Sequence, residues 1–237
     1  MSQAILFDNV KKSFGEQAVL KGVSLTVAAG ETVGLVGING AGKTTLIRAL
    51  LDLNRPDAGR ITIFGEDHLR PRSRRHLTYL AERFVPPPFA TGHEVLHHLC
   101  ELHGVHYDRE RAAREAVALD LDPLALDRHA RDYSKGMGQK LGLIACLLPR
   151  PKILVLDEPM SGLDPRARSA FKSRLGALAA DGITLFFSTH LLIDIDALCD
   201  RIAVLNKGLL HFDGTPEMLL EDTGAEDLEA AYLASIS

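Results

Sequence analysis

The stretch Gly37-Ile38-Asn39-Gly40-Ala41-Gly42-Lys43-Thr44 is the part of the sequence that decides the fold. It matches the pattern GxxxxGK[ST], in which glycines let successive backbone N–H groups turn inward around an anion. The apolar run Thr32–Val36 before it predicts a strand, and the pattern over residues 43–51 after it predicts a helix. A strand, a glycine-rich loop and a helix in this order favour a phosphate-binding loop over a glycine-rich turn without a ligand.

The residues of this loop have distinct expected roles. Lys43 is expected to reach the β- and γ-phosphates of a nucleotide, and the Thr44 hydroxyl is expected to ligate Mg²⁺. The start of the following helix adds a partial positive charge that favours an anion. The residues of this stretch that we expect to bind the nucleotide are Gly37, Ile38, Asn39, Gly40, Ala41, Gly42, Lys43, Thr44 and Thr45.

A second motif places two carboxylates at the end of an apolar run. Residues 153–156 predict a buried strand, and Asp157 and Glu158 follow it directly. Two adjacent negative charges are costly at a buried strand end unless they are used. Asp157 is expected to bind Mg²⁺ through a bridging water. Glu158 is placed to polarise an attacking water, because strand alternation turns it away from Asp157. The alternative is a carboxylate pair that caps the turn at Pro159.

Apolar runs that alternate with helical patterns indicate an α/β fold. Further strands are expected at residues 18–27, 60–64, 77–80 and 183–188, and two short polar helices are expected after Thr215. Three prolines, Pro86 to Pro88, exclude a helix over residues 84–89, because they lack N–H donors. From residue 92 to about residue 148 the pattern is helical throughout. The sequence therefore predicts an α/β core with a helical insertion over about residues 83–150.

Composition restricts the class of protein. The chain has 237 residues, 46% of them hydrophobic, with a net charge of −4, which argues against a broad nucleic-acid surface. A short basic run, Arg70 to Arg75, is expected to be a solvated loop. Three cysteines without a CxxC pair favour a reducing compartment over a disulfide framework. The chain shows neither a signal-peptide pattern nor an apolar run of 18 residues, so we expect no direct membrane insertion.

The remaining motifs carry a family resemblance. Tyr133-Ser134-Lys135-Gly136-Met137, ahead of a helix, resembles the LSGGQ signature of ATP-binding cassette (ABC) ATPases. Ser161-Gly162-Leu163-Asp164 resembles the D-loop of that family, and Ser188-Thr189-His190 resembles its switch-histidine loop. These motifs occur in the family's order and cover essentially the whole chain. The resemblance implies one nucleotide-binding domain over residues 1–237: a RecA-like P-loop NTPase core with an antiparallel β subdomain, formed by about residues 1–82 and 151–237, and the α-helical insertion.

The resemblance also implies a mechanism. ABC ATPases form a head-to-tail dimer around two Mg-ATP, in which Ser134 and Gly136 of one chain would close over the γ-phosphate held by Lys43 of the other. His190 would contact that phosphate and align Glu158, and Asp164 would link the two sites. The implied catalytic residues are Glu158, His190 and Lys43.

The chain departs from the family pattern at several positions. Lys135 replaces a glycine and Met137 replaces a glutamine in the signature. Glu82 stands where the family usually has the Q-loop glutamine, and as a carboxylate it would ligate Mg²⁺ or orient water. Phe14 is the candidate for stacking on adenine in place of a tyrosine. The alternative for Phe14 is a hairpin core residue.

The family's membrane subunit docks in the cleft after the Q-loop, which corresponds here to residues 82–106. Its apolar rim of Phe84, Val85, Pro86 and Phe89 is either exposed for docking or packed on the helical insertion. His93, His97 and Cys100 have a spacing compatible with a metal, but a solvated helix face is favoured.

We therefore predict an ATPase subunit of an ABC transporter, an exporter with a separate polytopic membrane permease. It would lie on the cytoplasmic face of the inner membrane, as a homodimer or with a paired cassette, and without nucleic acid. The alternative is a soluble ABC ATPase that remodels protein or nucleic acid. One cassette without coiled-coil or zinc insertions favours transport.

Overall fold

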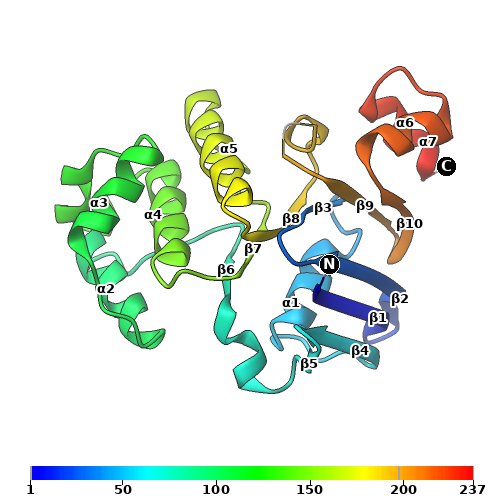
Figure 1. Ribbon diagram of the computed structural model, residues 1–237, viewed down its shortest axis with the longest axis horizontal. Helices are drawn as coiled ribbons and strands as arrows, with labels where there is room; N and C mark the ends of the chain where they lie inside the picture. The colour runs from blue at the N-terminus through cyan, green and yellow to red at the C-terminus, as the bar shows by residue number, and fades with distance from the viewer. Residues whose placement is uncertain (1, 197, 237) are drawn as a thin grey trace.

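The chain folds around two β-sheets, and the computed structural model describes residues 2–196 and 198–236 (Figure 1). A four-stranded antiparallel sheet has the order β2-β1-β4-β5, and a six-stranded sheet has the order β10-β9-β3-β8-β7-β6. The neighbours from β9 to β6 run parallel, and β10 joins the edge antiparallel to β9. These observations confirm the α/β class with an antiparallel β part.

The strands of the antiparallel sheet are β1 (Gln3–Phe14), β2 (Gln17–Ala28), β4 (Ala58–Ile63) and β5 (Glu66–Asp67). Those of the larger sheet are β3 (Thr32–Val36), β6 (Leu77–Leu80), β7 (Ile153–Asp157), β8 (Thr184–Thr189), β9 (Arg201–Asn206) and β10 (Leu209–Gly214). The α-helices are α1 (Lys43–Leu50), α2 (Gly92–Leu102), α3 (Arg109–Ala118), α4 (Lys135–Leu147), α5 (Pro165–Ala180), α6 (Pro216–Thr223) and α7 (Leu228–Ser235). The short 3₁₀ turns are η1 (Pro71–His76), η2 (Pro123–Asp127), η3 (Ala130–Asp132) and η4 (Leu192–Asp194).

The parallel arrangement of β3, β7 and β8 positions the predicted motifs. Every residue of these three strands is buried, as expected for central parallel strands covered on both faces. Val36 pairs with Thr189, and Asp157 pairs with Ser188. The carboxyl ends of the three strands therefore meet at one edge of the sheet, and the loops that follow them converge there.

Three apolar clusters hold the elements together. One lies between the parallel sheet and the helices α2, α4 and α5, and a second joins the sheet to α1 and to the antiparallel sheet. In the second cluster the rings of Phe7 and Phe186, one from each sheet, lie 5.8 Å apart at 44°. A third, smaller cluster attaches α6 and α7 to the end of β3 and to β9.

The helical segment is less regular than its sequence predicts. Helices α2, α3 and α4 form, and each begins at a side-chain cap: Thr91, Asp108 and Ser134 accept hydrogen bonds from the helix backbone. The expectation of helix throughout residues 92–148 is wrong for the connections. Gly104 ends the pattern in a turn after α2, and only the 3₁₀ turns η2 and η3 form between α3 and α4.

Some elements were not predicted. Strand β1 was not predicted, because a bulge near Asn9 breaks the alternation of apolar and polar residues along it. The φ of Asn9 is 49°, in the left-handed region. Helix α5 has a readable stripe at Ala167, Phe171, Leu175 and Leu178, all buried, and strand β9 is an apolar run. The apolar patterns of α5 and β9 were therefore sufficient to predict these two elements.

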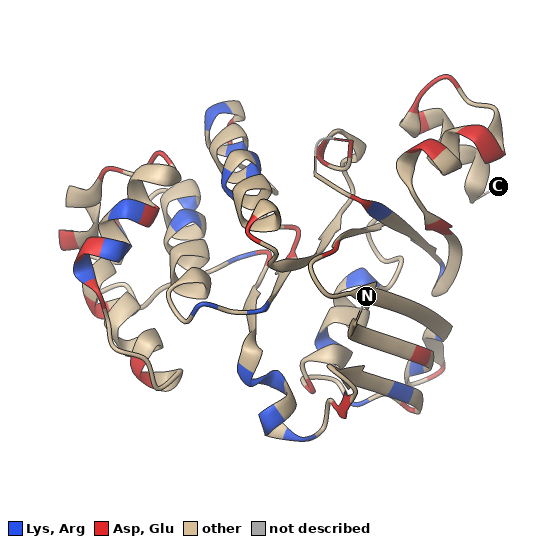
Figure 2. Ribbon diagram, viewed as in Figure 1, with Lys and Arg blue, Asp and Glu red and all other residues tan. Residues whose placement is uncertain are grey.

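The surface carries both signs of charge in mixture, and Figure 2 shows the arginines of η1 as a basic cluster at the foot of the view. Within it Arg72 pairs with Glu66 at 2.8 Å, and Arg74 lies 3.7 Å from Asp52. Surface pairs of this kind contribute little to stability. The partial neutralisation agrees with a solvated loop.

The three cysteines are free thiols. Cys100 and Cys146 are buried, and burial raises the pKa of the Cys146 thiol to about 12. Burial also raises the pKa of Cys100 and Cys199. Because the thiolate is the reactive form, these side chains are packing groups rather than nucleophiles at neutral pH.

The contact between the two sheets predicts a large cost for one substitution. Phe186→Ala removes a fully buried ring at the junction, so the free energy of unfolding should fall by about 3–5 kcal/mol. Phe89→Ala, at a ring that is 76% exposed, is the matched control and should change it by less than about 0.5 kcal/mol. Urea unfolding measures both, and a cost for Phe186→Ala no larger than the control's would contradict this packing.

Candidate functional site

The loop between β3 and α1 has the backbone that its glycines allow. Gly42, which precedes α1, has a φ of 112°, a conformation that residues with a side chain rarely adopt. Gly37 lies so close to β9 that a Cβ atom would stand 2.3 Å from the Leu205 carbonyl oxygen. The loop is therefore pressed against the sheet, with the N-terminus of α1 directly behind it.

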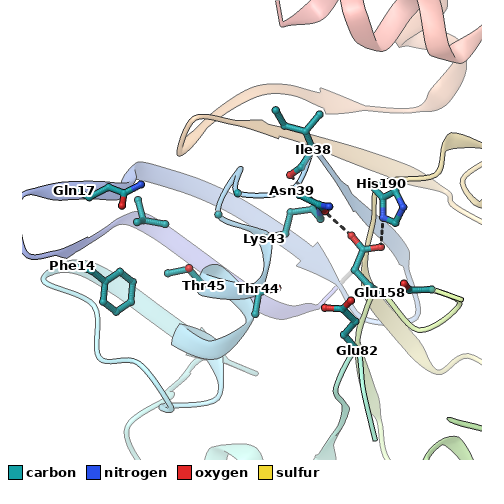
Figure 3. Close-up of a pocket in the computed structure, with 14 residues that line it drawn as sticks. Phe14, Gln17, Ile38, Asn39, Lys43, Thr44, Thr45, Glu82, Glu158 and His190 are labelled. Atoms are coloured by element: carbon teal, nitrogen blue, oxygen red, sulfur yellow. Dashed lines mark hydrogen bonds and ion pairs between the residues drawn. The ribbon is translucent and has the colours of Figure 1, made fainter. Parts of the chain in front are cut away.

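This loop forms one wall of an open hollow of about 530 Å³ (Figure 3). The predicted site residues that line the hollow are Phe14, Ile38, Asn39, Gly40, Gly42, Lys43, Thr44, Thr45, Glu82, Glu158 and His190. Gln17, Val19 and Ser161 line it as well, and none of these three was predicted. Residues from five separate stretches of the sequence thus meet at the carboxyl edge of the parallel sheet.

Three side chains in contact, Lys43, Glu158 and His190, cross the floor of the hollow. The Lys43 Nζ lies 3.0 Å from Glu158 Oε1, and His190 Nδ1 donates a hydrogen bond of 2.7 Å to Glu158 Oε2 (Figure 3). Lys43 and Glu158 are both buried, whereas the His190 side chain is 39% exposed. An ionised carboxylate only accepts hydrogen bonds, so this contact fixes a proton on Nδ1 of the imidazole.

Glu158 is held in an unusual backbone conformation. Its φ is 46°, in the left-handed region, so a turn after β7 and not strand alternation sets the direction of its side chain. Its N–H donates to the Ser188 Oγ at 2.9 Å. Its Oε1 is buried, and no well-aligned hydrogen bond among the described residues satisfies it. A strained residue whose buried oxygen has only an ion pair to Lys43 is typical of a functional position.

Asp157 lies beneath the loop, next to Thr44. Its Oδ1 accepts hydrogen bonds from the Thr44 hydroxyl at 3.1 Å and from the Ser188 hydroxyl at 2.6 Å. Ser188 thus links Asp157 to the backbone of Glu158, a role that the sequence analysis did not assign. Hydroxyl and carboxylate oxygens are ligands that Mg²⁺ prefers. Asp157 contacts Thr44 without lining the hollow itself, whereas Thr44 and Glu82 both line it.

Thr44, Asp157 and Glu82 are too few to hold a metal ion alone, but they suit a metal that is also bound by a substrate. Among residues 2–196 and 198–236, no group of three histidine, cysteine or acidic side chains is arranged to hold a metal ion. Mg²⁺ is commonly held by one or two carboxylates together with phosphate oxygens and water. The residues present therefore fit Mg²⁺ that arrives with a nucleotide.

Phe14 stands at the rim of the hollow at the end of β1. Its side chain is 48% exposed, and the Lys12 Nζ lies 5.4 Å from its ring centroid. This exposure contradicts the alternative of a hairpin core residue. The open ring face is available to stack on a flat partner.

The signature residues and Asp164 of the D-loop lie outside this hollow, whereas Ser161, the first residue of the D-loop, lines it. Ser134 caps α4 by accepting from the Met137 N–H, and it lines a separate hollow of about 480 Å³ beside the proline-rich segment. Asp164 caps α5 by accepting from the Ala167 N–H at 2.9 Å. The Lys135 side chain lies against the D-loop: its Nζ would be only 2.5 Å from a Cβ atom built on Gly162. Gly37 and Ala41 support the loop without lining its hollow.

The apolar residues after Glu82 were expected either to be exposed for docking or to pack on the helical insertion, and the structure shows some of each. Phe84 packs against the helical core, whereas Val85 and Phe89 are 69% and 76% exposed. Of the histidines that follow, His93 is bonded to the Tyr107 hydroxyl, and His97 and His98 are exposed.

Comparison with known proteins places the chain in a family. A family model described as "ABC transporter" matches residues 20–161. The "Nod factor export ATP-binding protein I" of Burkholderia lata is 37% identical over 232 residues, which are 94% of this chain and 75% of that protein. The chain belongs to the ABC transporter family.

Other relatives agree with this assignment. The "Daunorubicin resistance ATP-binding protein DrrA3" of Streptomyces coeruleorubidus is 36% identical over 95% of this ABC chain and 72% of its own length. A solved "ATP binding subunit of ABC transporter" matches 99% of this chain and 100% of its own, with a TM-score of 0.88 and 28% identity. The predicted family and ATPase class are confirmed: the chain is an ATP-binding subunit of an ABC transporter and an ATPase.

No helix among the described residues of this ABC subunit has the length and apolar character needed to cross a membrane.

Proposed function

We propose that this subunit hydrolyses ATP to drive export through a separate membrane permease. The observation that carries the proposal is the Glu158 carboxylate, which is held between Lys43 and His190 in the hollow formed by the phosphate-binding loop. A carboxylate that can accept a proton, an imidazole that holds it and a cation that can bind phosphate are what phosphoryl transfer to water uses.

Each group of the hollow has a proposed role. Lys43 leaves Glu158 for the β- and γ-phosphates, and the backbone N–H groups of residues 40–45 surround the phosphates. Thr44, Asp157 and Glu82 would hold Mg²⁺. When bound, this ion would neutralise part of the charge on the phosphates. Glu158, released from Lys43, accepts a proton from the attacking water, and His190 keeps it in place. Phe14 stacks on the adenine.

The position of the signature supports a site shared between two chains. Ser134 stands exposed at the N-terminus of α4, outside the hollow that contains Lys43. We propose that a second copy or a paired cassette, placed head to tail, brings its Ser134 and Gly136 onto the γ-phosphate. Asp164, at the start of α5, would lie between the two sites. Residues 1–237 would then act as one cassette, with the helical insertion at about residues 83–150 carrying the signature.

Two observations support export and a membrane partner. The relatives at 36–37% identity are named for Nod factor export and for daunorubicin resistance. The exposed Val85 and Phe89 offer an apolar surface beside Glu82, suited to a short helix of a permease. The subunit would then be peripheral, at the cytoplasmic face of the membrane that holds the permease.

Glu158→Gln tests the proposed general base. The amide keeps the size of the side chain but cannot accept the proton of water, so kcat should fall by about 10²–10⁴ while ATP still binds. Glu110→Gln, an exposed carboxylate on α3, is the control and should keep the wild-type rate. Phosphate release and ATP binding are measured on the same preparations. A Glu158→Gln variant with more than a tenth of the wild-type kcat would reject the role.

A pull-down from detergent-solubilised native membranes tests the transport role. The tagged chain should co-purify with a polytopic membrane protein in stoichiometric amount. Phe89→Asp should remove that partner, because it places a charge on the apolar surface, whereas Val117→Asp on the exposed side of α3 should retain it. Recovery of ribosomal or cytosolic partners in place of a membrane protein would leave the ATPase intact and overturn export.

A further inference from the structure

The C-terminal helix α7 packs beside the phosphate-binding loop. Its residues Ala231 and Tyr232 are buried in a cluster with Val36, the last residue of β3, and with Leu219 of α6. Ile195, which follows the switch-histidine loop, belongs to the same cluster. Helix α7 thus packs against residues that precede the phosphate-binding loop and follow the switch-histidine loop, although it lies at the far end of the sequence.

One polar contact joins this helix to the loop itself. The backbone N–H of Ile38 donates a hydrogen bond of 3.2 Å to the Tyr232 hydroxyl, across 194 positions of the sequence. Tyr232 is only 7% exposed, so its ring packs in the cluster while its hydroxyl reaches the loop. Apolar packing needs the ring alone, and the hydroxyl adds an acceptor for a loop N–H.

The same peptide group is held from its other side by Lys43. The N–H of Ile38 and the carbonyl of Gly37 belong to one planar trans peptide unit, and they point in opposite directions. The Gly37 carbonyl oxygen accepts from the Lys43 Nζ at 2.6 Å. Tyr232 and Lys43 therefore fix the orientation of a single peptide plane at its two ends.

This arrangement connects the tyrosine to the phosphate-binding amine. Rotation of the Gly37–Ile38 peptide would move the acceptor that holds Lys43, and the Ile38 carbonyl, which also accepts from Lys43 at 3.3 Å, follows in the chain. That carbonyl also accepts from the Ala41 N–H at 3.1 Å, which closes the turn of the loop. Holding the peptide fixed keeps both the turn and the amine ready for phosphate.

We infer that Tyr232 is a positioning residue for ATP binding: its hydroxyl holds the Gly37–Ile38 peptide and, through it, Lys43. Helix α7 is then part of the nucleotide-binding apparatus rather than a polar end of the chain. The inference rests on the proposed role of Lys43 in binding phosphate, and it does not depend on export or on a permease.

Tyr232→Phe in the full chain tests the inference. The ring and its packing remain and only the hydroxyl is lost, so the melting temperature should stay within about 2 °C of wild type. The KM for ATP and the Kd of a fluorescent ATP analogue should rise about 3- to 10-fold, the effect of one lost hydrogen bond. Because Lys43 holds the phosphates in ground and transition states alike, kcat should change less than about twofold.

Two further variants separate the possible results. Tyr107→Phe removes a tyrosine hydroxyl that bonds to His93 in the helical segment, and it should leave the KM for ATP unchanged. Lys43→Ala should abolish tight nucleotide binding. An unchanged KM in Tyr232→Phe, while Lys43→Ala loses binding, would overturn the inference alone. Unchanged binding in Lys43→Ala would reject the proposed phosphate site itself. Equal effects of Tyr232→Phe and Tyr107→Phe on KM would also overturn the inference.

Discussion

The carboxylate of Glu158, held between the Lys43 ammonium and the His190 imidazole, is the interaction on which the site depends. Each of the three groups follows a different strand of the parallel sheet, and they meet because β7, β8 and β3 are neighbours in it. Burial of Lys43 and Glu158 costs free energy that the pair and its hydrogen bonds must offset. Without one partner, the other would be an uncompensated buried charge.

The neighbours of the Lys43–Glu158 pair explain how the two side chains can separate when a phosphate binds. Lys43 is also held by the Gly37 and Ile38 carbonyls, so the amine keeps hydrogen-bond partners in the loop when it leaves Glu158. The Glu158 carboxylate keeps its 2.7 Å hydrogen bond from His190 when Lys43 moves to a phosphate, so one partner still holds it. A phosphate group satisfies the amine at least as well, because charge-assisted bonds to phosphate are strong. The contacts of Lys43 in the hollow are thus ones that a phosphate group can replace.

The sequence predicted the loops of the site better than the elements that support them. The phosphate loop and the Asp157-Glu158 pair follow from local spacing, since glycines and charges at a strand end have few other uses. The bulged strand β1 could not be predicted, because the turn at Asn9 breaks its alternation. The contacts of Ser188 and Tyr232 depend on which strands become neighbours and on where α7 packs, and no local pattern records either. The direction of Glu158 was inferred from strand alternation, but a left-handed turn sets it.

The separation of Ser134 from the Lys43 hollow supports the proposal that ATP is bound between two chains. The most direct test is the mass in solution of the Glu158→Gln chain, with and without Mg-ATP, measured by light scattering. We expect one chain without nucleotide and two chains with it, and a single chain again when Ser134→Arg is added. A mass that ATP does not change, or a dimer that survives Ser134→Arg, would contradict it.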